Sequence, residues 1–368
     1  MKIALIGGGS GGHLMPLIAV ARKIKEKVPE ATFLYIGPKG KMEKDIMDGE
    51  GIPSKYISVG KLRRYFSFQN FIDIFKVFAG LLQSMWILFV EMPDAIFSKG
   101  GYASLPVALA AWMFRIPVLI HESDAVPGLA NNIIGKFANR VAVSYASAEE
   151  EFLAAEVVLT GNPLREGINQ GNAQKARELF SLSAEKKIIL VLGGSQGART
   201  INNRVLSVLP ELLEKYQVIH QTGEANFAEV QHRAGELGYK IGREGYYAMP
   251  FMGEEIKDVY AVSDLVISRA GANSIAEIAA NQKPSILIPL QDSANDHQRM
   301  NAYSLAKVGA CIVLDENNLG KHIFLSRIEE IMNDEHLRQK LAKNIQSFYH
   351  PDATERIAKG VLEMINSK

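Results

Sequence analysis

The feature that most constrains this chain is a glycine-rich turn that occurs twice, each time between an apolar run and a helical pattern. The first copy, Gly7-Gly8-Gly9-Ser10-Gly11-Gly12-His13, follows the apolar residues 3–6 and precedes apolar residues at the i, i+3, i+4, i+7 spacing of a buried helix face. The second copy, residues 193–198, follows the apolar run 188–192. Glycine allows a sharp turn beside a ligand, and the N–H groups that open the next helix favour phosphate. The sequence therefore predicts two phosphate-type turns, one at the start of each half.

The spacing of the apolar runs predicts the fold class. The chain has 368 residues, which exceeds the length of roughly 250–300 at which a single core stops growing, so we expect two domains. Apolar runs alternate with helical patterns, as a parallel sheet requires. We predict an α/β fold with two Rossmann-like, doubly wound parallel-sheet domains facing each other across a cleft. Strand-like runs occupy residues 32–36, 94–97, 117–120, 140–143 and 157–159, and then 217–220, 245–248, 264–267, 284–288 and 311–314.

The boundary between the domains is predicted at a proline-containing linker. Residues 161–165 read Gly-Asn-Pro-Leu-Arg, and the Asn-Pro pair breaks regular structure. We therefore assign residues 1–162 to the first domain and residues 163–349 to the second. A capped helix start follows at residues 351–358.

Composition limits the classes of partner and the compartment. The formal net charge of +1 argues against a nucleic-acid binder that works through bulk charge. The single cysteine, Cys311, excludes an internal disulfide framework and suits a reducing compartment. The first residues read as a strand and a glycine turn, not as the apolar segment of a signal peptide, so we expect a cytoplasmic protein.

One apolar segment allows two interpretations. Residues 77–90 contain no charged side chain, but a membrane-spanning helix needs about 20 such residues, and Asp73 and Lys76 interrupt the upstream extension. A helix packed on the sheet explains part of this composition. The segment is nevertheless apolar nearly all round, and Lys61, Arg63 and Arg64 stand close upstream, as in segments that lie on membrane surfaces. The sequence leaves both interpretations open.

Polar residues follow several of the predicted strands. Ligands of open α/β sheets bind outside the carboxyl ends of the strands. His121 and Glu122, after the run 117–120, are therefore expected at the active edge, where either could serve chemistry or hold the adjacent loop. In the second half, the small-residue turn 268–274 opens a helix that carries Glu277, and the polar loop 289–298 precedes another helix.

Several ligand classes are disfavoured by what the motifs lack. The first glycine turn satisfies G-x-G-x-x-G, but Gly37-Pro38 stands where a dinucleotide-binding fold usually has an acidic residue for the ribose. The chain has no G-x-x-x-x-G-K-[ST] sequence, no Cys/His metal pattern and no Asp-x-Asp. We therefore expect no metal and no cofactor. If a diphosphate leaves in the reaction, helix N-termini and an arginine such as Arg165 must carry its charge.

Together these motifs resemble those of the metal-independent nucleotide-sugar glycosyltransferases of the GT-B architecture. Within that group the chain is similar to the family 28 enzymes of peptidoglycan synthesis, which add N-acetylglucosamine to undecaprenyl-diphospho-N-acetylmuramoyl-pentapeptide. The sequence departs from the family at Asp124, where asparagine is frequent, which puts that residue's contact with the donor sugar in doubt. The matching blocks occur in the family's order at residues 7–13, 100–102, 121–122, 127–131, 161–165, 193–199, 269–272, 277–280, 297–298 and 351–356.

The resemblance implies a role for each matching residue. UDP-N-acetylglucosamine would bind the second domain, with Ser195 and its turn beside the diphosphate, Met252 near the uracil and Glu277 on the ribose hydroxyls. The turn that begins at Ala272 would follow the nucleotide, Gln298 would contact the sugar, and the Ser10 turn would reach both the donor and the lipid diphosphate. The implied substrate-binding set is Ser10, Gly11, Gly12, Tyr102, Asp124, Asn131, Arg165, Ser195, Gln196, Met252, Ala272, Asn273, Ser274, Glu277, His297 and Gln298.

The resemblance also implies an inverting transfer to the acceptor's 4-hydroxyl. His13 is the first choice for the catalytic base, although it could instead bond the lipid diphosphate or fix its own loop; Glu122 is the other candidate. The lipid acceptor implies peripheral attachment to the cytoplasmic face of the cell membrane, with cell-wall synthesis and division proteins as partners. We further expect the helix at about 350–368 to pack back on the first domain.

Two alternatives remain open from the sequence. The chain could catalyse another reaction on the same architecture, such as that of a UDP-N-acetylglucosamine 2-epimerase or of a different lipid-linked glycosyltransferase. It could also be a non-catalytic, membrane-associated scaffold of the cell-wall machinery. The presence of His13, Arg165 and Glu277 argues against a scaffold, which would not need them.

Overall fold

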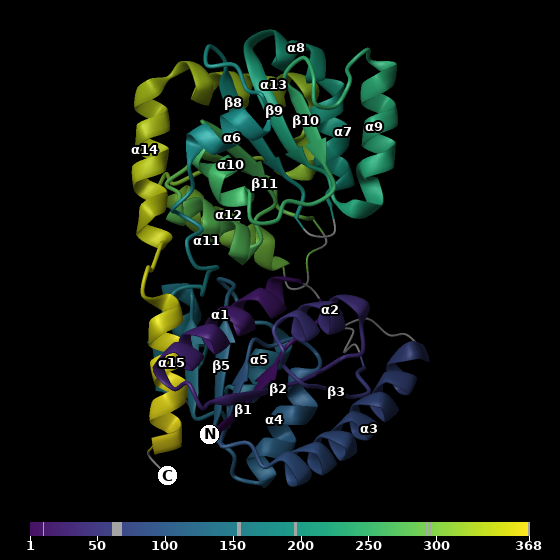
Figure 1. Cartoon of the computed structure of the whole chain (residues 1–368), viewed down its shortest axis with the longest axis vertical. Helices are drawn as coiled ribbons and strands as arrows, with labels where there is room; N and C mark the ends of the chain where they lie inside the picture. Colours follow the sequence, from purple (N-terminus) through teal and green to yellow (C-terminus); the bar gives the residue numbers. More distant parts are fainter. Residues whose placement is uncertain are drawn as a thin grey trace. The chain divides into compact units, whose positions relative to one another are not determined.

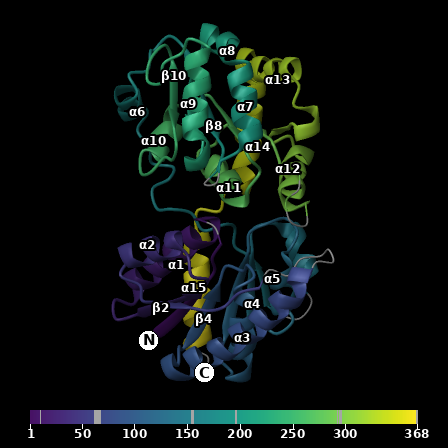
Figure 2. The ribbon, with the colours of Figure 1, turned by 90° about the vertical axis from the view of Figure 1, so that its right-hand side faces the viewer.

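The chain folds into two compact units, each built around one parallel sheet (Figures 1 and 2). The computed structural model describes residues 1–9, 11–60, 68–152, 156–194, 197–291, 293 and 296–366. Unit 1 comprises Met1–Arg165 and His350–Lys368, and unit 2 comprises Glu166–Tyr349. Each unit is an α/β domain, which confirms the predicted fold class.

Within the described residues, the sheet of unit 1 has seven parallel strands in the order β3-β2-β1-β4-β5-β6-β7. The sequence analysis missed β3, a three-residue edge strand without a fully buried side chain. It also ended the strand at residue 120 too early, because His121 and Glu122 are the last two residues of β5. The strands are β1 Lys2–Ile6, β2 Thr32–Gly37, β3 Ser54–Tyr56, β4 Ala95–Ser98, β5 Val118–Glu122, β6 Arg140–Val143 and β7 Glu156–Leu159.

Helices cover both faces of this sheet. Successive side chains of a strand point to opposite faces. In β1, Ile3 and Leu5 enter the core beneath α1 and α15, whereas Ala4 and Ile6 enter the core beneath α3 and α4. Figure 2 shows α3, α4 and α5 on one side of the sheet. The helical segments are α1 Gly11–Lys27, α2 Lys41–Gly49, α3 Phe68–Glu91, α4 Ser104–Met113, α5 Leu129–Ile134, the 3-10 helix η1 Ala146–Glu151 and α15 Ala353–Asn366.

The last helix, α15, belongs to unit 1 although the chain reaches it through unit 2. It lies beside α1 (Figure 1), with Val361 fully buried in the shared core. Arg140 fixes it further, because one guanidinium nitrogen donates to the Gly360 carbonyl at 3.2 Å and to Glu363 at 2.7 Å. The two ends of the chain are thus joined in one unit.

Within the described residues, the sheet of unit 2 has six parallel strands in the order β10-β9-β8-β11-β12-β13. The strands are β8 Lys187–Leu192, β9 Tyr216–Gln221, β10 Tyr246–Met249, β11 Leu265–Ser268, β12 Ser285–Leu287 and β13 Ile312–Val313. The helical segments are α6 Ala173–Leu179, α7 Arg199–Ser207, α8 Leu209–Lys215, η2 Glu224–Asn226, α9 Phe227–Glu236, α10 Ile256–Val262, α11 Ala272–Ala280, α12 His297–Lys307, η4 Glu316–Asn318, α13 Lys321–Asn333, α14 Glu335–Ile345 and η5 Gln346–Phe348.

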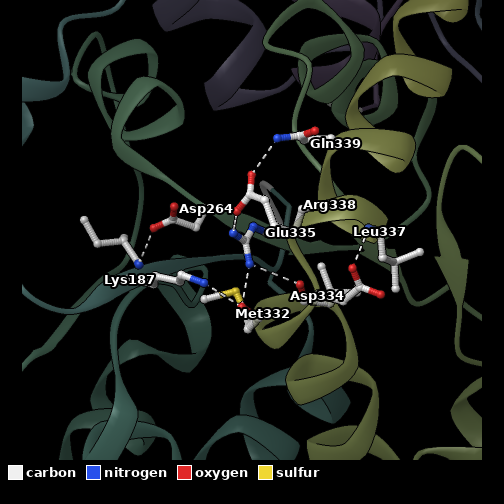
Figure 3. Close-up of polar contacts among 10 residues, drawn as sticks. Lys187, Asp264, Met332, Asp334, Glu335, Leu337, Arg338 and Gln339 are labelled. Carbon is white, nitrogen blue, oxygen red and sulfur yellow. Dashed lines mark hydrogen bonds and ion pairs between the residues drawn. The ribbon is translucent and has the colours of Figure 1, made fainter.

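Polar contacts anchor the corner between α13 and α14 to the start of β8 (Figure 3). The Lys187 ammonium and the Arg338 guanidinium both donate to the carbonyl of Met332, the penultimate residue of α13. The Asp334 carboxylate caps α14 by accepting from the Leu337 N–H at 3.0 Å. This corner lies at the amino ends of the strands of unit 2, opposite the edge of the sheet that carries the second glycine turn.

Candidate functional site

The first glycine turn, at the carboxyl end of β1, is held by two buried side chains. Gly8 and Gly9 have φ values of 142° and 88°, which L side chains rarely adopt. The Gly9 N–H donates to the Glu43 carboxylate at 2.9 Å, and the Tyr35 hydroxyl donates to the Gly7 carbonyl at 2.7 Å. Burial, followed by the charge of Glu43, raises the pKa of Tyr35 above its ordinary value, so the hydroxyl stays protonated. These two bonds therefore hold the backbone of Gly7 and Gly9 in place.

His13 lies next to this turn. It occupies the first turn of α1 together with Gly11 and Gly12. A Cβ added to Gly101, in the loop after β4, would lie 3.6 Å from His13 Nδ1, so the imidazole packs against that loop. A Cβ added to Gly9 would lie 2.8 Å from the Tyr102 hydroxyl. His13 and Tyr102 thus gather with the glycine turn at the carboxyl edge of β1 and β4.

Glu122 holds the loop that follows β5. Its side chain is buried, and its oxygens accept hydrogen bonds from the Asp124 N–H and the Gly128 N–H, both at 3.0 Å, and from Asn131 Nδ2 at 2.9 Å. Burial, then the charge of Asp124, raises the pKa of Glu122, while these hydrogen bonds oppose the rise. The geometry favours the interpretation in which Glu122 shapes the loop.

A buried lysine lies beside this loop. Lys99 Nζ lies 2.7 Å from His121 Nδ1 and 3.2 Å from Asn162 Oδ1. The Lys99 ammonium can only donate hydrogen bonds, so His121 Nδ1 accepts from it. His121 Nε2 then donates to the Gly161 carbonyl at 3.0 Å. Burial, then the charge of Lys99, lowers the pKa of His121 well below its ordinary value, so the ring is neutral. His121 therefore joins the end of β4 to the segment after β7.

The buried ammonium predicts a distinctive pH dependence of stability. Burial lowers the pKa of Lys99 from 10.5 to about 8, against the opposing charges of Glu122 and Asp124. The folded chain then holds this proton less strongly than the unfolded chain. The buried ammonium therefore lowers the free energy of unfolding by its full amount below about pH 8. This destabilisation disappears as the pH rises to about 10.5.

We therefore expect the free energy of unfolding of the wild type to rise, relative to Lys99→Met, by up to about 3 kcal/mol across this window. Urea unfolding at each pH measures the difference. Lys359→Met is the matched control, because the Lys359 side chain is 71% exposed. If the Lys99→Met difference stays constant with pH, the ammonium is not desolvated in the folded chain.

The second glycine turn, at the carboxyl end of β8, is equally tight where it is described. Gly197 has a φ of 77°, and a Cβ there would lie 2.5 Å from the Thr222 carbonyl oxygen. Close by, the buried Met252 donates its N–H to Gln221 Oε1 at 3.2 Å. Met252 thus lies near the carboxyl end of β9, adjacent to the second turn.

Glu277 lies in the second turn of α11, which begins directly after β11. Its carboxylate accepts a hydrogen bond from the hydroxyl of Tyr260, a fully buried residue of α10, at 3.2 Å. Ala272, Asn273 and Ser274 form the first turn of the same helix. The carboxylate therefore has a fixed orientation one turn away from the helix start.

His297 and Gln298 open α12, after the loop that follows β12. Gln298 Oε1 accepts from the Leu290 N–H at 3.0 Å, which closes this loop on the start of the helix. Arg165 is the last residue of unit 1 before the chain enters unit 2. Of the residues named from the sequence, Ser10, Lys61, Arg63, Arg64, Ser195 and Gln196 lie outside the described part of the chain.

The sequence analysis did not single out Glu43, Lys99 or Glu316 as site residues. Glu43 is a charged residue of α2, and its burial there is visible only in the structure. Lys99 lies in the polar stretch that follows the predicted strand 94–97, but its partner Asn162 is distant in the chain, as is Arg269, the partner of Glu316. Among the described residues, no group of His, Cys, Asp and Glu side chains is arranged to hold a metal ion.

Comparison with known proteins gives the class and the family. Residues 3–143 match the glycosyltransferase family 28 N-terminal domain, and residues 188–357 match the family 28 C-terminal domain. A relative from Clostridium perfringens is 39% identical over 366 residues, which cover 99% of this chain and 97% of the relative. That relative is named UDP-N-acetylglucosamine–N-acetylmuramyl-(pentapeptide) pyrophosphoryl-undecaprenol N-acetylglucosamine transferase.

Solved structures with the same fold are also found. The crystal structure of Acinetobacter baumannii MurG superposes with a TM-score of 0.75 at 25% identity and covers 98% of this chain and 99% of that one. A UDP-GlcNAc 2-epimerase from Neisseria meningitidis, bound to UDP-GlcNAc, has a TM-score of 0.68 at 12% identity over 99% of this chain and all of that one, which shows the fold alone.

The fold and these matches define an enzyme of the GT-B glycosyltransferases. The chain belongs to glycosyltransferase family 28, the family that the sequence motifs predicted.

Proposed function

We propose that this enzyme transfers N-acetylglucosamine from UDP-N-acetylglucosamine to the 4-hydroxyl of undecaprenyl-diphospho-N-acetylmuramoyl-pentapeptide, with inversion and without a metal ion. The observation that carries the proposal is the 39% identity, across nearly the whole length of both chains, to a transferase named for this donor and acceptor.

The residues of unit 2 supply groups suited to the donor. The glycine turn and the start of α7 offer N–H groups to a diphosphate. The oriented Glu277 carboxylate suits the ribose diol, and Met252 offers an apolar surface to the uracil. Helix N-termini of unit 2, with Arg165 from the adjoining end of unit 1, would stabilise the charge of the departing UDP, which is the task that a divalent cation performs elsewhere.

The residues of unit 1 supply groups suited to the acceptor. The first glycine turn would bind the lipid diphosphate, with Tyr102 and Asn131 beside it. His13, at the edge of that turn, would remove the proton of the attacking 4-hydroxyl in a single in-line displacement. Asp124 and Glu122 would shape the neighbouring loop.

An exposed apolar stripe on α3 favours contact with a membrane. Leu88 on the same helix is fully buried against the sheet, and five large apolar side chains on the opposite face are between 52% and 68% exposed. Their spacing of three and four residues places them on one face. None of the described helices is both long and apolar enough to span a bilayer. We propose that this stripe lies on the cytoplasmic surface of the membrane that holds the lipid acceptor. Its residues are Phe75, Phe78, Leu82, Trp86 and Phe89.

Replacing two residues of the stripe tests this attachment. Phe78→Ser with Trp86→Ser is expected to weaken binding to vesicles of bacterial lipids by about tenfold or more, because burying each large apolar side chain is worth about 1.5–3 kcal/mol. Vesicle cosedimentation measures the effect. Leu179→Ser on α6 is the matched control, since Leu179 is 63% exposed but lies in unit 2. Equal binding of the double variant and the wild type would show that another surface of the protein contacts the membrane.

The activity itself is tested with labelled UDP-N-acetylglucosamine and a short-chain analogue of the lipid acceptor. The expected product is a disaccharide lipid, formed at an unchanged rate in excess EDTA. A strict requirement for magnesium would contradict the charge stabilisation proposed above. Epimerisation of the donor without acceptor would favour the epimerase alternative, and the absence of any turnover would favour a scaffold.

A further inference from the structure

A single carboxylate of unit 2 contacts three turns at the carboxyl edge of the sheet. Glu316 opens η4, shortly after the edge strand β13, and its side chain is only 13% exposed. Its Oε1 accepts from Arg269 Nη2 at 2.6 Å, and its Oε2 accepts from the Gln291 N–H at 3.3 Å. The Thr200 side chain lies close to the same carboxylate.

Each of these partners belongs to a different turn. Thr200 is the second residue of α7, directly after the second glycine turn. Arg269 follows β11 and precedes the start of α11, the helix that carries Glu277. Gln291 lies in the loop between β12 and α12, the helix that opens with His297 and Gln298. Glu316 therefore lies among the three turns to which the family resemblance assigns the donor.

The contact between Glu316 and Arg269 is a well-anchored ion pair. The Arg269 side chain is 11% exposed, and its Nη1 donates to the Ile288 carbonyl at 3.2 Å. Burial would raise the pKa of Glu316, but the hydrogen bond and charge of Arg269, with the nearby Thr200 side chain and the Gln291 N–H, lower it below its ordinary value. The carboxylate is therefore ionised at neutral pH and satisfied by fixed donors.

We propose that Glu316 is a positioning residue for donor binding, which sets the three turns at the separation that the diphosphate and the sugar require. This inference rests on the proposed function. Glu316 need not touch the donor, because its oxygens already bind the turns. Preorganised donors lose most of their value when they are misplaced by about 1 Å, and such a shift can cost about 100-fold.

The test compares Glu316→Gln with the wild type in steady-state kinetics, with donor and acceptor varied separately. Glutamine keeps the size of the side chain but removes the charge that holds Arg269. We expect the donor KM and the Kd for UDP to rise about 10- to 100-fold, and the acceptor KM to stay unchanged. A purely structural role would instead lower the active fraction, and with it kcat, without moving the donor KM alone.

Two further variants sharpen the result. Asp315→Asn is the matched control, because this adjacent carboxylate contacts Tyr303 and Arg299 instead of the three turns. Glu316→Asp keeps the charge but shortens the side chain, and should give an intermediate donor KM. A donor KM of Glu316→Gln no higher than that of Asp315→Asn overturns the inference, and so does an equal rise in both KM values. If the wild type itself neither binds UDP nor forms product, the proposed function is wrong instead.

Discussion

Replacing His13 with alanine is expected to lower kcat by about 10²–10⁴-fold while the KM values for donor and acceptor change little. The attacking hydroxyl is a poor nucleophile and gains from losing its proton as the new bond forms. His13 is suited to accept that proton, because it lies in the first turn of α1 against the loop at Gly101, among the residues assigned to the acceptor. An imidazole can accept a proton near neutral pH, which suits a general base.

The pH profile distinguishes a base from a phosphate ligand. In the wild type, kcat should fall at acidic pH as the base becomes protonated, and His13→Ala should lose that limb. If His13 only binds the lipid diphosphate, its loss should raise the acceptor KM instead. Retention of more than about a tenth of kcat, with the acidic limb intact, would exclude His13 as the base.

Glu122→Gln provides the comparison. The Glu122 oxygens already accept from the Asp124 N–H, the Gly128 N–H and Asn131. A glutamine amide would direct N–H groups at these donors, so we expect a distorted loop and altered KM values, with the acidic limb preserved. Loss of that limb in Glu122→Gln alone would make Glu122 the base.

The fold could be predicted from the sequence because its strands are buried on both faces. Such strands read as continuous apolar runs, and twelve predicted runs coincide with described strands of the two sheets. The errors have a physical cause. β3 is short and half-exposed, so it lacks the apolar signal. His121 and Glu122 look like a loop by polarity, yet their backbones continue the ladder opposite Ala142 and Val143.

The candidate site could be predicted only in part, because only its glycine turns are local in sequence. A turn at φ values that exclude side chains is visible as a run of glycines. The groups that hold the turns are not visible in this way. Gly9 meets Glu43, Lys99 meets Asn162, and the Arg269 turn meets Glu316 only after strands distant in the chain are paired.

Glu277→Ala is expected to weaken UDP binding by about 1.5–3 kcal/mol, the usual value of hydrogen bonds to a charged group. The Glu277 carboxylate lies in the second turn of α11, and the buried Tyr260 hydroxyl orients it at 3.2 Å. Calorimetry with UDP and 2′-deoxy-UDP isolates the ribose contact. The wild type should prefer UDP, and Glu277→Ala should bind both ligands equally. Tyr260→Phe, which removes only the orienting bond, should cost about 1 kcal/mol. If Glu277→Ala binds UDP as tightly as the wild type, or keeps the preference for the 2′-hydroxyl, the ribose is recognised by another residue.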